Sequence, residues 1–213
     1  MDEEIQIINQ NTRKEKIKNF IYDNKKILIS LIIIIFLTII LFFWYSEFKN
    51  NKQVNLAFEF NEITQSYNSN KNKNVGKKLI DIINKKDKTY SPLALNFIID
   101  NQILENKSQI NDLFDIIINI KLEEEIKNLI IYKKALYNSE NSKENELLKI
   151  LNPILNSESI WKSHSLYLMA EYFLSKNEKE KSKEFLTRII ELEFANPSIK
   201  AEAQKRINRD FSD

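Results

Sequence analysis

His164 is the only histidine of the 213-residue chain, which contains no cysteine. A catalytic triad or a cysteine–histidine dyad needs an imidazole beside a nucleophile, and protein zinc sites draw several ligands from histidine and cysteine. A multi-histidine site, a thiolate metal site and a cysteine–histidine dyad are therefore excluded. Ser163 and Ser165 flank the imidazole, but side chains of adjacent helical residues point in different directions. We interpret His164 as a solvated surface or rim residue and expect no catalytic residue.

Two other patterns could carry chemistry and are better explained structurally. Glu123, Glu124 and Glu125 resemble a cation site, yet three successive helical residues splay over about 200°. We expect them to begin a helix, whose dipole favours acidic residues there. Gly76 is the only glycine, so a glycine-rich phosphate loop cannot form. We expect no metal ion, no cofactor and no small-molecule substrate.

The longest uninterrupted apolar segment runs from Ile27 to Tyr45, nineteen residues without a charge, proline or glycine. As a helix it reaches about 28 Å, close to the roughly 30 Å of a bilayer's hydrocarbon core. Fifteen of the nineteen are Ile, Leu or Phe, which favours insertion by roughly 4 to 9 kcal/mol. We predict a transmembrane helix over residues 27–46, with these anchor residues marking it: Ile27, Leu31, Ile35, Leu41, Trp44 and Tyr45.

A soluble core helix rarely contains so long an apolar run, and an isolated strand would leave backbone groups unpaired in lipid. A cleavable signal peptide is disfavoured because aromatic residues, not small ones, end the run. Cations remain on the cytoplasmic side during insertion. Lys49 and Lys52 are the only cations in the twenty residues after Tyr45, whereas six precede the span: Arg13, Lys14, Lys16, Lys18, Lys25 and Lys26. We therefore expect a cytoplasmic basic head over residues 1–26 and a domain over 47–213 beyond the membrane, in the periplasm of a bacterium.

Beyond the span, apolar residues recur at helical spacing, which predicts an all-α domain. We expect helices near 53–68, 75–86, 92–105, 108–121, 123–138, 143–156, 159–176, 178–194 and 197–210. Asn68 to Asn74 is expected to form a loop. Ser91 before Pro92 and Asn196 before Pro197 are expected to cap helix starts, because proline is tolerated in the first turn. The 32 Lys and Arg nearly balance the 30 Asp and Glu, so we expect no nucleic-acid partner.

The turns that begin at Asn106, Asn141 and Asn177 repeat with a period of about 35 residues, which is typical of stacked helical hairpins. The last repeat resembles a tetratricopeptide repeat, in which small residues let two helices approach closely. The residues that carry this resemblance, and that we expect to pack the repeats, are Leu166, Met169, Ala170, Phe173, Ser182, Leu186 and Ile189. We predict a tetratricopeptide-like α-solenoid of stacked hairpins; a generic helical bundle is the alternative.

Five aromatic side chains remain open to two interpretations. Trp161 could contact a partner or pack between repeats, and packing is favoured. Four tyrosines could face the groove or fill the seams, and the sequence does not decide between these for Tyr132, Tyr137, Tyr167 and Tyr172. We therefore assign no partner-binding groove.

The head also resembles the start of tetratricopeptide-like inner-membrane proteins of the YfgM type, which are ancillary subunits of the bacterial Sec translocon. The similarity lies in Ile7 to Asn9, in Arg13 to Ile17 and in Phe20 to Tyr22, ahead of a single span, and in a domain that ends with residues 201–207. It implies a non-enzymatic scaffold beside the translocation channel that links exported chains to periplasmic chaperones. The head would fix topology and touch anionic lipid, or alternatively dock on the channel.

Three rival interpretations stay open. The chain could be an envelope assembly scaffold for cell division or outer-membrane biogenesis. It could be a regulator whose head holds a cytoplasmic stress-response protein. With reversed topology, it could be an organelle import receptor with its repeats in the cytosol.

Overall fold

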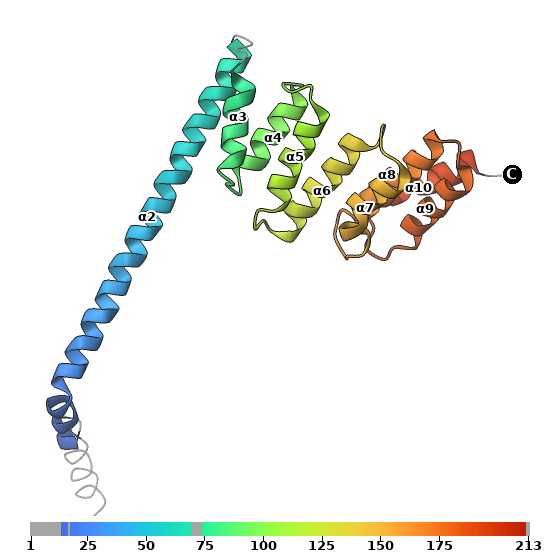
Figure 1. Ribbon diagram of the computed structural model, residues 1–213. Helices are drawn as coiled ribbons and strands as arrows, with labels where there is room; N and C mark the ends of the chain where they lie inside the picture. The colour runs from blue at the N-terminus through green and yellow to red at the C-terminus, as the bar shows by residue number, and fades with distance from the viewer. Residues whose placement is uncertain (1–13, 17, 70–73, 212–213) are drawn as a thin grey trace, which may run out of the picture. The chain divides into compact units, whose positions relative to one another are not determined.

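The structure is a computed structural model that describes residues 14–16, 18–69 and 74–211. These residues form α-helices and short connections, without a β-strand (Figure 1). The chain divides into two compact units, residues 1–56 and 57–213. Helix α2 (Lys25–Ser69) contributes residues to both units, so each unit is considered separately below.

Helix α2 is longer than the sequence analysis predicted. The expected transmembrane segment and the expected helix near 53–68 form one helix of 45 residues. The reason is local: residues 46–52 contain neither proline nor glycine, the residues that most disfavour a helix interior. Asn68 and Ser69, expected in a loop, are the last residues of this helix, and residues 70–73 of that loop lie outside the described residues.

In the first unit, α2 is the one described helix that is long and apolar enough to cross a membrane. Most of its large apolar side chains in this unit are exposed, and these include the six expected anchor residues: Ile27, Leu31, Ile35, Leu41, Trp44 and Tyr45. Five of the expected topology cations are exposed as well, namely Lys14, Lys16, Lys18, Lys25 and Lys26. Arg13 and residues 7–9, on which part of the resemblance rests, lie outside the described residues.

In the second unit, eight helices follow the end of α2. They are α3 (Val75–Asn84), α4 (Tyr90–Asp100), α5 (Lys107–Ile118), α6 (Glu124–Asn138), α7 (Glu144–Leu155), α8 (Lys162–Ser175), α9 (Lys179–Glu191) and α10 (Pro197–Asp210). Each helix from α3 onward contacts the next along the chain. The all-helical prediction is confirmed, with each of these helices within a few residues of its expected position.

Two residues that precede a proline were predicted to cap helices, and the structure confirms one of these caps. Asn196 caps α10 as predicted, because its side chain accepts hydrogen bonds from the backbone N–H groups of Ser198 and Ile199. The prediction for Ser91 was wrong. Asp87 Oδ1 accepts hydrogen bonds from the N–H groups of Thr89 and of Tyr90, where α4 begins. The fully buried Ser91 hydroxyl lies near the carbonyl oxygens of Ile82 and Ile83, each 3.2 Å away.

Glu123 to Glu125 open α6 as expected, with Glu123 at the cap and the other two in the first turn. Three helix ends require a left-handed backbone, and none of them has glycine there. Lys86, Gln102 and Asn177 adopt φ values of 54°, 50° and 62°. Gly76 does not have a left-handed backbone. A Cβ at this position would lie 3.2 Å from Ile103 Cγ2 and 3.3 Å from Leu104 Cδ2. The glycine lets α3 approach the segment after α4.

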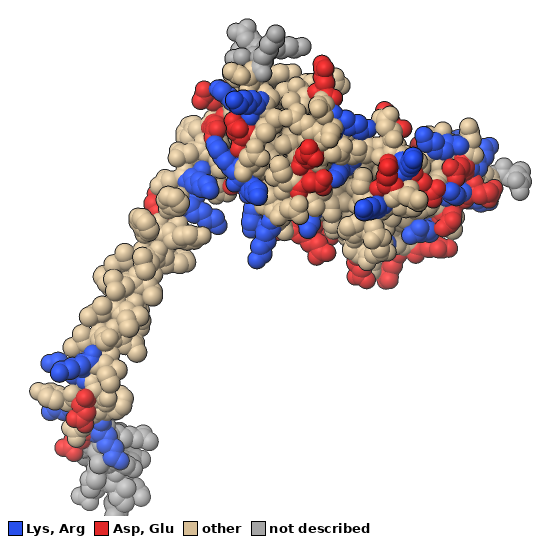
Figure 2. Space-filling view, in the orientation of Figure 1, with Lys and Arg blue, Asp and Glu red and all other residues tan. Residues whose placement is uncertain are grey.

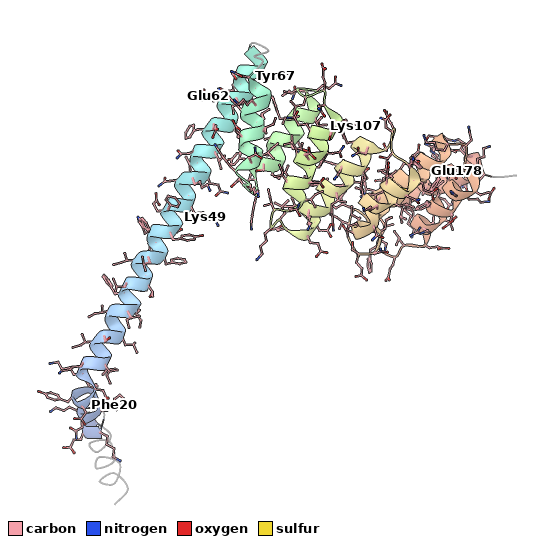
Figure 3. The ribbon with its side chains drawn as sticks, in the orientation of Figure 1. Phe20, Lys49, Glu62, Tyr67, Lys107 and Glu178 are labelled. Atoms are coloured by element: carbon pink, nitrogen blue, oxygen red, sulfur yellow. The ribbon has the colours of Figure 1, made fainter. Side chains whose placement is uncertain are left out.

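Hydrogen bonds and ion pairs join residues that lie about one period apart. Tyr67 Oη donates to the carbonyl of Asn101, 34 positions away, at 3.3 Å (Figure 3). Lys133 Nζ and Asn96 Oδ1 are 37 positions apart and 2.9 Å from each other. Three more pairs continue the series: Ser159 with Glu125, Lys181 with Glu144, and Asn196 with Ser163, separated by 34, 37 and 33 positions. Helices two elements apart are therefore neighbours, as the contacts of α3 with α5, α6 with α8, and α8 with α10 also indicate.

Apolar stripes from successive helices form the core of this unit. Leu79, Ile83, Leu95, Ile98 and Ile117 are inaccessible to solvent or nearly so. A larger buried cluster extends from α6 to α10 and ends at Ala203. Since each helix buries its stripe against neighbours on both sides, no single hairpin has a complete core of its own.

Candidate interaction surface

The seven residues expected to pack the last repeat are all buried at the contact of α8 with α9. Each is at most 2% exposed: Leu166, Met169, Ala170 and Phe173 on α8, and Ser182, Leu186 and Ile189 on α9. Ser182 Oγ donates to the carbonyl oxygen of Ala170 at 2.8 Å, so the two backbones approach closely at these small residues. These positions stabilise the domain and are not accessible to a partner.

Aromatic and charged groups extend this contact toward α7. The rings of Phe173 and Phe185 lie with centroids 5.4 Å apart, and Lys181 Nζ lies 4.9 Å from the Phe173 centroid. The same ammonium forms ion pairs of 2.8 Å with Glu144 and with Glu178, labelled in Figure 3. The hydrogen bonds that Lys181 donates to these two carboxylates raise its pKa above the ordinary value. Lys181 therefore stays charged at any physiological pH.

Trp161 packs between α6 and the start of α8. Its indole is stacked on the Tyr132 ring of α6 at 5.7 Å, and the His164 ring lies 5.1 Å from it. Burial raises the pKa of Tyr132. His164 is half-buried, and its Nδ1 atom has no contact with solvent. The imidazole is thus a rim residue packed on the rings of Tyr132 and Trp161, which agrees with the rim alternative of the expectation and not with a solvated surface side chain.

The remaining tyrosines also contact neighbouring helices. Tyr172 donates to the carbonyl of Ser142 at 3.1 Å and so fills the seam between α7 and α8. The Tyr137 ring lies 6.0 Å from that of Phe114. Burial, followed by the nearby Glu171 carboxylate, raises the pKa of Tyr167. The Tyr167 hydroxyl is therefore not tuned toward ionisation at neutral pH.

Nothing in this geometry assembles a reactive centre around His164. His164 Nδ1 and Ser165 Oγ are both buried without a hydrogen-bond partner in the described part of the chain, and Asn128 Nδ2 is a third such atom. Ser163 Oγ accepts the backbone N–H of Asn196 instead of meeting the imidazole. Among the described residues, no group of three or more His, Cys, Asp or Glu side chains is placed to hold a metal ion.

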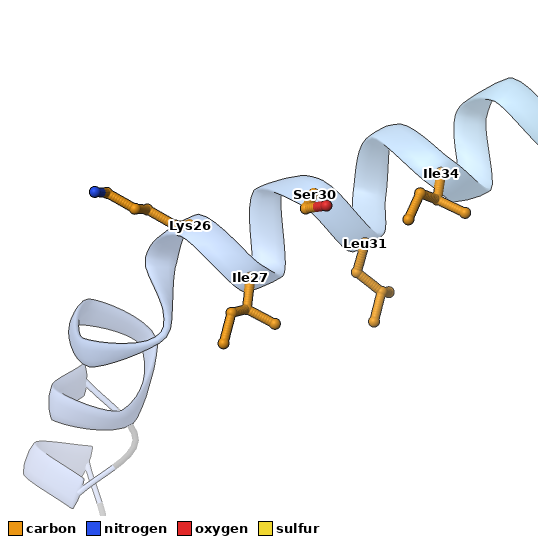
Figure 4. Close-up of a pocket in the computed structure, with 5 residues that line it drawn as sticks. All are labelled: Lys26, Ile27, Ser30, Leu31 and Ile34. Atoms are coloured by element: carbon orange, nitrogen blue, oxygen red, sulfur yellow. The ribbon is translucent and has the colours of Figure 1, made fainter.

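The described surface includes two hollows that are candidate sites. One, of about 360 Å³, lies along the side of α2 and is lined by Lys26, Ile27, Ser30, Leu31 and Ile34 (Figure 4). These residues follow each other at helical spacing on one exposed helix, so the hollow is a gap between neighbouring side chains. The other, of about 190 Å³, is lined by residues of two connections, Glu158, Ser159, Lys162, Leu192, Glu193 and Phe194.

The second hollow involves residues that the sequence analysis did not select. Phe194 is 86% exposed, and Ile160, next to the lining residue Ser159, is 63% exposed. The sequence did contain a signal for them, because both apolar residues lie two or three positions before the start of a helix, Ile160 before α8 and Phe194 before α10.

Comparisons with protein-family models, curated proteins and solved structures found no match.

Proposed function

We propose that this chain is a single-pass membrane protein whose helical-repeat domain is a non-catalytic scaffold for protein partners. The observation that carries the proposal is the nineteen-residue apolar stretch of α2, whose large side chains that can be described lie exposed except for the half-buried Leu28, in a chain that continues into packed helical hairpins. Exposed side chains of this kind are disfavoured in water and favoured in lipid. A chain of packed hairpins presents extended surfaces for peptides or protein partners.

The scaffold is a tetratricopeptide-like α-solenoid. This reading is supported by the bonds between residues 33 to 37 positions apart, which match a repeat of about 35 residues. The close approach of Ala170 and Ser182 is a second support, since tetratricopeptide repeats use small residues where their two helices meet. Residues 1–26 are the cytoplasmic head, 27–46 the span and 47–213 the periplasmic domain of a bacterial inner-membrane protein.

Within this class, we favour an ancillary subunit of the Sec translocon that links exported chains to periplasmic chaperones. The support is the resemblance to YfgM-type proteins in the head and in the order of the segments. An envelope assembly scaffold or a stress-response regulator would share the anchor and the repeats, and only the identity of the partner separates these roles.

In-cell photocrosslinking tests the partner. A photoreactive amino acid is placed at exposed positions of the domain, such as Lys52 and Leu93, and of the head, at Tyr22, and captured neighbours are identified by mass spectrometry. Channel subunits together with periplasmic chaperones are expected. Division or outer-membrane assembly proteins alone would replace the translocon role with the assembly role, and stress-response proteins alone would support the regulator.

Topology is tested separately with a reporter fused after Asp213 and with protease added to spheroplasts. A periplasmic signal and digestion of the domain are expected; a cytosolic reporter would overturn the orientation and favour the import-receptor alternative. Changing the four head cations Arg13, Lys14, Lys16 and Lys18 to glutamine, in molecules whose orientation is verified, tests docking by the head. Unchanged capture of channel subunits would restrict the head to setting topology.

A further inference from the structure

The second unit exposes few large apolar side chains, and their spacing is regular. Among its described residues, those at least 40% exposed are Phe58, Leu93, Ile126, Leu136, Ile160 and Phe194. Five of these six are separated by 35, 33, 34 and 34 positions, and only Leu136 falls outside the series. Single exposed apolar residues need no explanation, but a series at the repeat spacing places them together.

The bonds between repeats bring the last three members of the series side by side. Glu125 and Ser159, hydrogen-bonded at 2.7 Å, are the neighbours in sequence of Ile126 and Ile160. Two observations place Ile160 near Phe194. The Asn196 N–H donates to Ser163 Oγ, and Ser159 and Phe194 line the same hollow. We call Ile126, Ile160 and Phe194 the apolar row.

The apolar row is surrounded by an excess of carboxylates. Residues 121–127, 156–162 and 191–196 contain six glutamates against three lysines. Five of the glutamates are exposed, whereas two of the lysines are half-buried: Glu123, Glu124, Glu158, Glu191 and Glu193, against Lys127 and Lys162. Figure 2 shows the acidic side chains gathered along the lower edge of the region that contains α6 to α9. An apolar row with an acidic border is complementary to an apolar face bordered by cations.

The spacing of the apolar row indicates whether a helical or an extended segment fits it better. Packed helices lie about 8 to 10 Å apart, and α6, α8 and α10, on which or just before which the row members lie, contact one another in that order, so we expect a similar separation between successive members. Residues i and i+7 of a helix share a face and lie about 10.5 Å apart along its axis. An extended segment places same-face residues at multiples of about 6.6 Å, which fits less well. Three anchors on a helix require about fifteen residues.

We propose that the apolar row and its glutamate border form a docking site for a cationic amphipathic helical segment of a protein partner. The inference rests on the proposed function as a protein-binding scaffold and specifies the surface and the partner chemistry. An anionic lipid surface would be repelled by the glutamates. A second copy in a two-fold interface would place the same glutamate excess against itself, since such an interface pairs one patch with its own copy.

The binding test uses the full chain in nanodiscs of zwitterionic phosphatidylcholine, with empty nanodiscs as the baseline. The probe is a fluorescein-labelled leucine–lysine peptide about eighteen residues long, whose leucines form one helical face. Two control peptides have the same composition in scrambled order, or glutamate in place of lysine. Binding is measured by fluorescence anisotropy at about 0.05 M and about 0.5 M salt, because exposed charge pairs are screened at the higher concentration.

The variant Ile160→Gln/Phe194→Gln tests the apolar row, and Leu136→Gln is its matched control. Leu136 is 50% exposed and lies near the opposite end of α6 from Ile126. We expect the row variant to weaken binding at least about tenfold and the control variant to bind as the unmodified chain does. We expect Glu158→Gln/Glu193→Gln to weaken binding at low salt and to reduce the salt dependence. Far-ultraviolet circular dichroism verifies that each variant keeps its helix content.

Several results would overturn the docking site. Equal binding of the scrambled or glutamate peptide would remove the selectivity, and equal loss in the Leu136 variant would remove the location. If the row variant instead converts a dimer to a monomer in mass photometry, a second copy covers the row. No binding of the peptide, in a chain that still captures channel subunits in cells, refutes the docking site alone; binding without such capture refutes the translocon role and leaves the docking site standing.

Discussion

The close contact of α8 and α9 predicts that a larger residue at Ala170 destabilises the domain through a specific pair of side chains. Ala170 and Ser182 are each 1% exposed, and the Ser182 hydroxyl lies 2.8 Å from the Ala170 carbonyl oxygen. The change Ala170→Leu adds three carbon atoms at this point. Overpacking costs about 1 to 3 kcal/mol and loss of the hydrogen bond about 1 kcal/mol, so we expect a total of about 2 to 4 kcal/mol.

A double-mutant cycle separates the two terms. Ser182→Ala alone removes the hydrogen bond and is expected to cost about 1 kcal/mol. In the double variant the hydrogen bond can be lost only once. The free-energy cost of the double variant should therefore be about 1 kcal/mol smaller than the sum of the two single-variant costs. Ala201→Leu, at an exposed position of α10, is the matched control and should stay within about 0.5 kcal/mol of the unmodified chain.

Urea unfolding of the full chain in detergent micelles measures these free energies by circular dichroism and by tryptophan fluorescence, in a Trp44→Phe background that leaves Trp161 as the one tryptophan. Trp161 reports on the domain because its indole packs on Tyr132 and His164. If Ala170→Leu is no more destabilising than Ala201→Leu, small residues are not what lets α8 and α9 approach, and the argument for tetratricopeptide-like packing fails.

Three further predictions concern the anchor, a turn and the last helix. Replacing Ile35 and Leu37 with lysine should cost about 6 to 8 kcal/mol of insertion free energy and make the chain extractable by alkali, whereas an Ile35→Val chain should stay in the membrane fraction. Lys86→Gly should increase the free energy of unfolding by about 0.5 to 1 kcal/mol and so raise the urea midpoint, because the φ of 54° at this position is left-handed and favours glycine; a lower midpoint would contradict this. The hydrogen bond from Arg209 holds the pKa of Asp210 at about 2, below its usual 3.8, so this stabilisation is present above about pH 4 and is lost as the pH falls through about 2. The difference in melting temperature between the unmodified chain and Asp210→Asn should therefore vanish near pH 2, and a constant difference down to that pH would refute the assignment.

The helix positions could be predicted because they depend on local features. Apolar spacing, the Asn196–Pro197 start and the acidic residues opening α6 all act within one or two turns. The end of α2 was also locally encoded, since the residues between the span and the next expected helix contain no helix breaker. That segment was read as two elements because its composition changes sharply after Tyr45, although composition does not interrupt a helix.

The surroundings of individual side chains were less accessible to sequence reasoning. The placement of His164 depends on Tyr132, thirty-two positions earlier, which lies beside it only because α6 packs on α8. Ser91 was misread for the same reason, since the carbonyls near its hydroxyl belong to α3. The apolar row was detectable only after the repeat register was known, because a single exposed Ile or Phe is uninformative by itself.

The described bonds between repeats reach no further than 37 positions along the chain. A polypeptide with such short-range contacts forms each hairpin against the one already made and needs no segment from its far end to complete an early part of the fold. If synthesis and translocation deliver the domain amino end first, its structure can grow at the rate of delivery, with little unfolded chain exposed to proteases at any moment.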